Sequence, residues 1–97
     1  MSDECRLDVW LWRARFFKTR SLAAGYISSR GVRVTRDGTT RKLNKPASRL
    51  AVGDVVSLAL GSQIVELRIL DFGSRRGPAS EAQTLYDRLD GRGSGEA

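Results

Sequence analysis

Apolar residues near the N-terminus recur at the spacing of an α-helix. Between residues 6 and about 18 they follow the i, i+3, i+4, i+7 pattern, at Leu7, Trp10, Leu11, Ala14 and Phe17. At about 100° per residue, a second apolar set falls on nearly the opposite side, at Val9, Trp12 and Phe16. A helix that is apolar on two sides must be covered on both, or must offer one side to a partner.

A second helix is predicted from Arg20 to Arg30. Thr19 or Ser21 can cap its start, and Gly31 suits the left-handed position after its end. Its apolar stripe comprises Leu22, Ala23, Tyr26 and Ile27. Gly25 lies in the middle, where glycine costs about 1 kcal/mol relative to alanine. We expect close packing against the first helix to explain this glycine.

Beyond Gly31 the apolar period changes from that of a helix to two. Val32 and Val34 alternate with polar residues, as in a half-buried strand, and the Asp37-Gly38 pair is a strong turn signal. Further strands are predicted at 39–43, 55–60 and 63–70. The pattern predicts an α+β fold, in which two packed helices lie against a small, mostly antiparallel sheet.

The C-terminal part combines a basic loop with a short apolar stripe. Arg75 and Arg76 lie in the loop at 73–77, and Pro78 resembles a helix start. A helix is predicted from there to Asp90, with its apolar stripe at Ala82, Leu85, Tyr86 and Leu89. We expect this stripe to cover Val9, Trp12 and Phe16. The predicted organisation is a domain at 6–72, an appended loop and helix at 73–90, and a disordered tail at 91–97.

Positive charge is concentrated in the first half of the chain. Residues 1–50 hold twelve of the seventeen Lys and Arg residues and four of the eleven acidic ones, a formal charge of +8. A localised cationic face suits a polyanion, and the start of a helix with cationic neighbours suits a phosphate. The predicted phosphate-binding residues are Arg13, Arg15, Lys18, Thr19, Arg20, Ser21, Arg30, Arg33, Arg41 and Lys42.

Several kinds of chemistry have no matching residues in the sequence. The chain contains no His, no nucleophile-elbow pattern and no glycine-rich phosphate loop, and its acidic residues are scattered. One cysteine, Cys5, cannot form a zinc site without His. We therefore expect a binding protein with no cofactor or metal, and no catalysis. No apolar run approaches the length of a membrane span, which predicts a cytoplasmic protein without a membrane partner.

A set of residues in the first part of the chain gives it a resemblance to a known family. The residues concerned are Arg6-Leu7-Asp8, Leu11, Ala14, Thr19-Arg20-Ser21, Ala24, Ile27, Gly31-Val32, Val34 and Val52-Gly53-Asp54-Val55. In this order they resemble the alpha-L RNA-binding motif of the domain family named after ribosomal protein S4. The resemblance implies two helices packed on a small sheet, and binding of structured RNA.

Residues 6–12, 16–20 and 75–82 resemble a narrower family, the ribosome-associated fifteen-kilodalton heat-shock proteins. That resemblance implies binding to ribosomal RNA and a role in recycling stalled ribosomes during the stress response to heat. The implied partners are the large ribosomal subunit and the peptidyl-tRNA of its nascent chain.

Two other functions remain open from the sequence. The same domain occurs as an appendage of RNA-modifying enzymes such as pseudouridine synthases, so the chain could be a detached module. Two helices joined by a turn also imitate the helix-turn-helix of DNA-binding regulators, although a strand directly after Gly31 disfavours this. Trp12 and Phe16 could stack on unpaired bases, but core packing is the favoured role for both.

Overall fold

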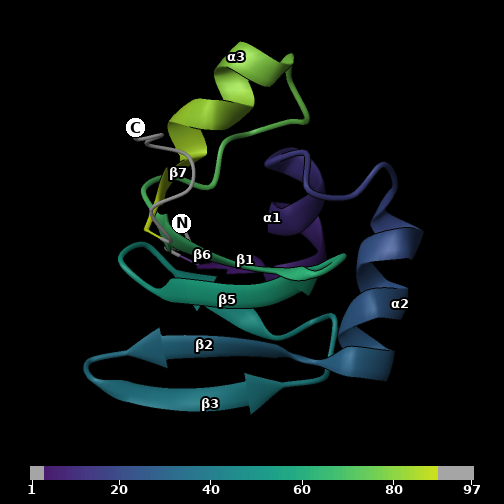
Figure 1. The fold of residues 1–97 in the computed structure, drawn as a ribbon. Coiled ribbons are helices and arrows are strands. Elements are labelled where there is room, and N and C mark those ends of the chain that lie inside the picture. The colour runs from purple at the N-terminus through teal and green to yellow at the C-terminus, as the bar shows by residue number, and fades with distance from the viewer. Residues whose placement is uncertain (1–3, 90–97) are drawn as a thin grey trace.

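Two helices pack side by side: the first lies over one face of a twisted antiparallel sheet, and the second lies at one end of that sheet (Figure 1). The computed structural model describes residues 4–89, so the predicted disordered tail at 91–97 lies outside the described residues. The elements in chain order are β1 (Glu4–Arg6), α1 (Leu7–Arg13), α2 (Arg20–Arg30), β2 (Val32–Arg36), β3 (Thr39–Leu43), β4 (Arg49–Ala51), β5 (Val55–Leu60), β6 (Gln63–Ile69), α3 (Ala79–Ala82), the 3₁₀ turn η1 (Gln83–Leu85) and β7 (Tyr86–Arg88). The predicted α+β class is confirmed.

The larger sheet has the strand order β3-β2-β5-β6-β7, with every neighbouring pair antiparallel. Val34, Val56 and Leu67 form one row across its inner face and are buried. The Asp37-Gly38 turn has φ values of 52° and 80°, as a two-residue type I′ turn requires, and it pairs Arg36 with Thr39. A separate two-stranded sheet joins β1 to β4, and the sequence predicted neither of these two strands.

The first helix is shorter than predicted. It ends at Arg13 and not near residue 18, because Arg15 adopts a left-handed backbone with φ 68°. The Phe16 and Arg15 N–H groups donate to the carbonyls of Leu11 and Trp12, which is the hydrogen-bond pattern of a Schellman motif. Phe16 and Phe17 continue the helical spacing in sequence but pack onto the core from the loop that follows.

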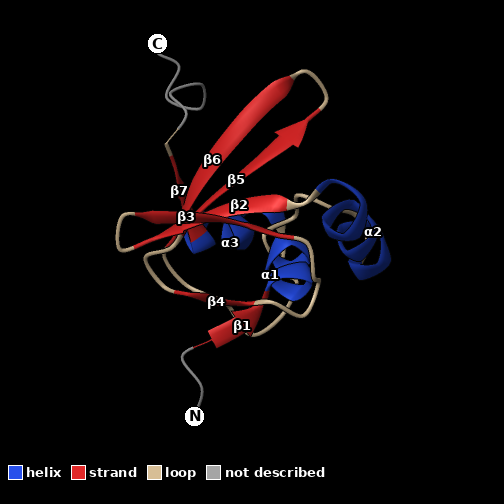
Figure 2. Cartoon of the chain, turned by 90° about the horizontal axis from the view of Figure 1, so that it is seen from below, coloured by secondary structure: helices blue, strands red, loops and turns tan. Residues whose placement is uncertain are grey.

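The second helix has the predicted bounds. Thr19 caps it, since its Oγ1 accepts a hydrogen bond from the Leu22 N–H at 3.0 Å, and Gly31 follows its end with φ 79°. Ala23 and Ile27 are buried, whereas Leu22 is exposed. Figure 2 shows α1 and α2 side by side.

The explanation expected for Gly25 is wrong. Gly25 is exposed, and a Cβ built on it has no heavy atom within 4 Å, so packing against α1 does not require a glycine there. Replacement of Gly25 by Ala is therefore expected to raise the free energy of unfolding by about 1 kcal/mol, because alanine loses less backbone entropy in a helix. Urea unfolding followed by circular dichroism measures the change. A loss of stability would mean that α2 has a close neighbour at this position.

The C-terminal helix is also shorter than predicted. It gives way at Leu85 to β7, in which Tyr86 pairs with Ile69 of β6. The pairing satisfies backbone groups at the edge of β6, a long-range gain that local helical spacing does not reveal. Leu85 is buried in the core, and the Tyr86 ring lies 5.0 Å from that of Phe16. Trp12 instead has the Arg76 guanidinium 6.0 Å from its ring centroid.

Candidate nucleic-acid interface

The start of α2 presents one group of the predicted residues together. Lys18, Thr19, Arg20 and Ser21 are all exposed there. Thr19 uses its hydroxyl and its carbonyl on the Leu22 and Ala23 N–H groups, while the first N–H groups of a helix have no partner within it. Exposed N–H groups beside two cations form a suitable site for a phosphate.

The opposite end of α2 meets the outer face of the sheet and brings together a second group. Arg30, Arg33 and Lys42 line one hollow of about 210 Å³ with Tyr26 and Ser57. The Tyr26 hydroxyl accepts a hydrogen bond from the Ala59 N–H at 2.8 Å, which holds the helix against β5. The Arg30 guanidinium lies 5.9 Å from the Tyr26 ring centroid.

Arg33 and Lys42 are direct partners across β2 and β3, so their side chains lie on one face of the sheet. Like charges in this arrangement repel each other and destabilise the sheet. Lys42 also passes close to Gly31, where an added Cβ would lie 2.6 Å from the Lys42 Cε. A bound anion between the two cations would offset the repulsion.

Arg41 does not belong to this face. It is the partner of Val34, whose side chain points into the core, and consecutive residues of a strand point to opposite faces. Arg41 and Lys42, which the sequence placed in one site, therefore lie on opposite faces of β3. Arg41 lines a different hollow, between β3 and the segment at 48–49.

The side chains of Arg13 and Arg15 make hydrogen bonds within the fold. Arg13 Nη1 donates to the Gly73 carbonyl at 2.9 Å, and Arg15 Nε donates to the Gly77 carbonyl at 2.7 Å. In the reverse direction, Arg76 Nε donates to the Trp12 carbonyl at 3.1 Å. These bonds fasten the end of α1 to the loop before α3. Arg13 and Arg15 thus have a structural role that charge alone did not reveal.

The salt bridges of residues 4–89 involve none of the predicted site cations. Their basic partners are Arg6, Arg36, Arg68 and Arg75. Hydrogen bonding to Asp8 raises the pKa of Arg6, and hydrogen bonding to Glu81 raises the pKa of Arg75. In contrast, within the described part of the chain no hydrogen bond or ion pair involves the side chains of Lys18, Arg20, Arg33, Arg41 or Lys42. These cations are available to an external anion.

We also inspected the described residues for a reactive thiol, a metal site and a membrane-spanning helix. Burial raises the pKa of the Cys5 thiol, which favours its protonated form. Within residues 4–89, no three His, Cys, Asp or Glu residues come together as a metal site. No helix in that range is long and apolar enough to cross a membrane.

Two residues at the second group were missed from the sequence. The helical spacing indicates only an apolar stripe for Tyr26, and no local pattern singles out Ser57. Ser57 lies beside Arg33 only because β2 pairs with β5, which is a long-range register. The hydroxyl of Tyr26 is the feature of the sequence that indicates a further role, since a tyrosine in an apolar stripe commonly makes a hydrogen bond through its hydroxyl.

The two helices, the sheet and the basic groups at either end of α2 describe an RNA-binding fold. Residues 5–56, more than half of the chain, match the S4 domain, and the protein belongs to the S4 domain family. The resemblance identified in the sequence is confirmed, and membership of this family implies RNA binding.

The more particular similarity is to Heat shock protein 15. The homolog from Haemophilus influenzae is 37% identical over 87 residues, which cover 90% of this chain and 63% of the relative. Heat shock protein 15 of Escherichia coli K12 is 37% identical over 84 residues, covering 87% of this chain and 59% of the relative. The chain thus spans about three fifths of the length of these two relatives.

A solved structure supports the same relationship. Heat Shock Protein 15 of Vibrio cholerae, described as trimeric, superposes with a TM-score of 0.75 at 36% sequence identity. The match covers 90% of this chain and 83% of that one. The similarity therefore extends beyond the S4 domain into the C-terminal segment of the chain.

Proposed function

We propose that the protein binds structured ribosomal RNA of the large subunit, without catalysis. The observation that carries this proposal is the set of unpaired cations at the two ends of α2, in a chain whose family binds RNA. Charged groups that form no ion pair within the described part of the chain contribute little to stability through their charge, so a binding role accounts for them better.

The proposed interface runs along α2. At 1.5 Å per residue, Arg20 and Arg30 are separated by roughly 15 Å of helix. Lys18 and Arg20 would contact phosphates at one end, and Arg30, Arg33 and Lys42 would contact them at the other. Two separated groups of cations recognise the path of a folded backbone, so shape supplies the selectivity and phosphates supply most of the affinity.

The proposal of a ribosomal role is based on the similarity to the relatives. Their name, Heat shock protein 15, supports a function under heat stress. We propose that the protein acts in recycling stalled ribosomes, with the large ribosomal subunit as its partner and peptidyl-tRNA as a further contact. Crosslinking the protein in heat-stressed cells and sequencing the attached RNA tests this role. Enrichment of messenger RNA without large-subunit RNA would contradict it.

Salt dependence tests the phosphate contacts directly. If roughly five phosphates are neutralised, a plot of log K against log salt should slope by about −3 to −5, because each contact releases condensed counterions. Fluorescence anisotropy with a labelled RNA hairpin measures the slope. A duplex DNA of equal length, at the same salt, is the control, and it is expected to bind more weakly. A flat response, or tighter binding to DNA, would reject the proposal.

A further inference from the structure

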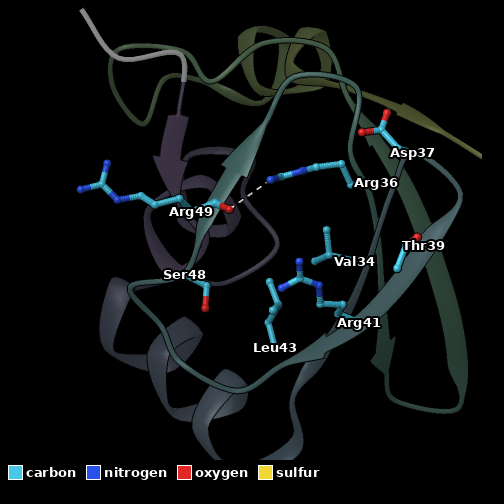
Figure 3. Close-up of a pocket in the computed structure, with 8 residues that line it drawn as sticks. All are labelled: Val34, Arg36, Asp37, Thr39, Arg41, Leu43, Ser48 and Arg49. Carbon is cyan, nitrogen blue, oxygen red and sulfur yellow. Dashed lines mark hydrogen bonds between the residues drawn. The ribbon is translucent and has the colours of Figure 1, made fainter.

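The face of the β2–β3 hairpin opposite the proposed interface holds a second hollow, of about 330 Å³ (Figure 3). That volume is at the lower end of the range for small-molecule sites. Its walls come from the inner side of the hairpin and from the segment that leads into β4. The lining residues are Val34, Arg36, Asp37, Thr39, Arg41, Leu43, Ser48 and Arg49.

The hollow exists because the inner face of β3 is only partly apolar. Thr39, Arg41 and Leu43 point inward, since they pair with Arg36, Val34 and Val32 in turn. An inward position of a sheet normally carries an apolar residue, but here Arg41 of β3 and Arg36 of β2 occupy two such positions. Arg36 is held by the buried carboxylate of Asp54, at 2.9 and 2.8 Å.

Arg41 differs from Arg36 in having no acidic partner. Among residues 4–89, no salt bridge involves Arg41. Its side chain points toward the side of the hollow that Val34 and Leu43 line in Figure 3, whereas the Arg49 side chain points away from the hollow. The hollow thus combines the cation of Arg41, two hydroxyls from Thr39 and Ser48 and an apolar floor, and the paired Arg36 and the turn residue Asp37 complete its lining.

We propose that this hollow binds one unpaired nucleotide of the RNA, with its phosphate on Arg41 and its base against Val34 and Leu43. The proposal rests on the proposed function, because the nucleotide belongs to the same RNA. A nucleotide combines a negative charge with a flat, partly apolar ring, which matches the two parts of the hollow. Unstacked bases are the usual targets of RNA recognition beyond shape.

The position of β3 lets one RNA reach both faces. β3 is the last strand of the sheet on its side, so in the described part of the chain no further strand pairs with its outer edge. Lys42 lies on the outer face and Arg41 on the inner face of this edge strand. A single strand leaving a helical RNA on Lys42 can pass around the edge and place its next nucleotide on Arg41.

Two hairpin RNAs that differ only by a short single-stranded overhang test the proposal. The overhang is expected to raise affinity about tenfold, the effect of one added charge-assisted contact to Arg41. Arg41→Ala should reduce that gain to less than about twofold. The matched control is Lys42→Ala, which removes the same charge from the neighbouring residue. It should weaken both hairpins and keep the gain.

Backbone amide NMR of the intact chain provides an independent test of nucleotide binding in the hollow. Adenosine and uridine monophosphates should shift the amide signals of Val34, Leu43 and Ser48, and Arg41→Ala should abolish these shifts. Inorganic phosphate alone should shift them less, because it lacks a base. Shifts confined to Arg33 and Ser57 would overturn the proposal. Shifts produced by an acidic peptide but by neither nucleotide would assign the hollow to a protein partner instead.

The two proposals fail separately. If the blunt hairpin binds and the overhang adds nothing, the nucleotide pocket is wrong while the proposed function stands. If neither hairpin binds, the proposed function is wrong, and the monophosphate titration still decides whether the hollow takes a nucleotide. A gain that persists in Arg41→Ala also rejects the pocket.

Discussion

Arg36→Ala is expected to lower the free energy of unfolding by about 2–3 kcal/mol, because it leaves the buried carboxylate of Asp54 without its charged partner, while water can enter from the side of the half-exposed Arg36. Asp54 is 2% exposed, and Arg36 meets both of its oxygens. The Asp54 carboxylate also accepts a hydrogen bond from the Ala51 N–H, at 2.9 Å. The pair joins the β2–β3 hairpin to the turn before β5. Urea unfolding followed by circular dichroism measures the loss.

Arg68→Ala is the matched control for this experiment. Arg68 and Asp87 are both about half exposed and 3.9 Å apart, so losing this pair should cost at most about 1 kcal/mol. The double variant Arg36→Ala with Asp54→Ala should be more stable than the two single losses predict, since the residues are in direct contact. Equal costs for Arg36→Ala and Arg68→Ala would contradict the assignment of Asp54 as a buried charge that needs Arg36.

Removal of the cations at both ends of α2 is expected to weaken RNA binding roughly 100- to 1,000-fold near physiological salt. The variants are the pair Lys18→Ala with Arg20→Ala, the pair Arg33→Ala with Lys42→Ala, and the two pairs combined. Each lost phosphate contact should reduce the salt slope by about one, and the loss should be similar across RNA sequences. Fluorescence anisotropy at several salt concentrations measures affinity and slope together.

A pair that removes the same charge elsewhere controls for net charge. Arg68 and Arg75 are exposed and each pairs with a carboxylate, so their replacement by alanine changes the net charge without touching the proposed interface. This control pair should reduce affinity only weakly. If it weakens binding as much as the Arg33 and Lys42 pair, the affinity reflects overall charge, and the proposed interface is wrong.

The basic residues divide into three roles that charge counting cannot separate. Arg13 and Arg15 hold backbone carbonyls of the loop before α3, and Arg36 neutralises a buried carboxylate. Lys18, Arg20, Arg33 and Lys42 belong to the proposed interface. A guanidinium has the same charge in each case, and only its neighbours in space distinguish a structural arginine from one that is available to RNA.

The predictable part of the candidate site was the part governed by local rules. The Thr19 cap, the bounds of α2 and the left-handed Gly31 follow from side-chain and backbone preferences within a few residues. The cations at 18–20 therefore lie where the sequence indicated. The predicted set did not reveal that Arg41 and Lys42 lie on opposite faces of the sheet, which follows from the alternation of side chains along β3.

Local preferences in the chain were enough to predict α2, the strands β2, β3, β5 and β6, the α+β class and the concentration of positive charge. Pairing between distant segments decided the rest. The side chain of Arg15, the left-handed residue after α1, donates to the distant Gly77 carbonyl, and pairing with β6 turns Tyr86 into a strand residue despite its helical spacing. Such contacts gain free energy from partners 17 (86 − 69) to 62 residues away in sequence, which outweighs the small preferences that local patterns report.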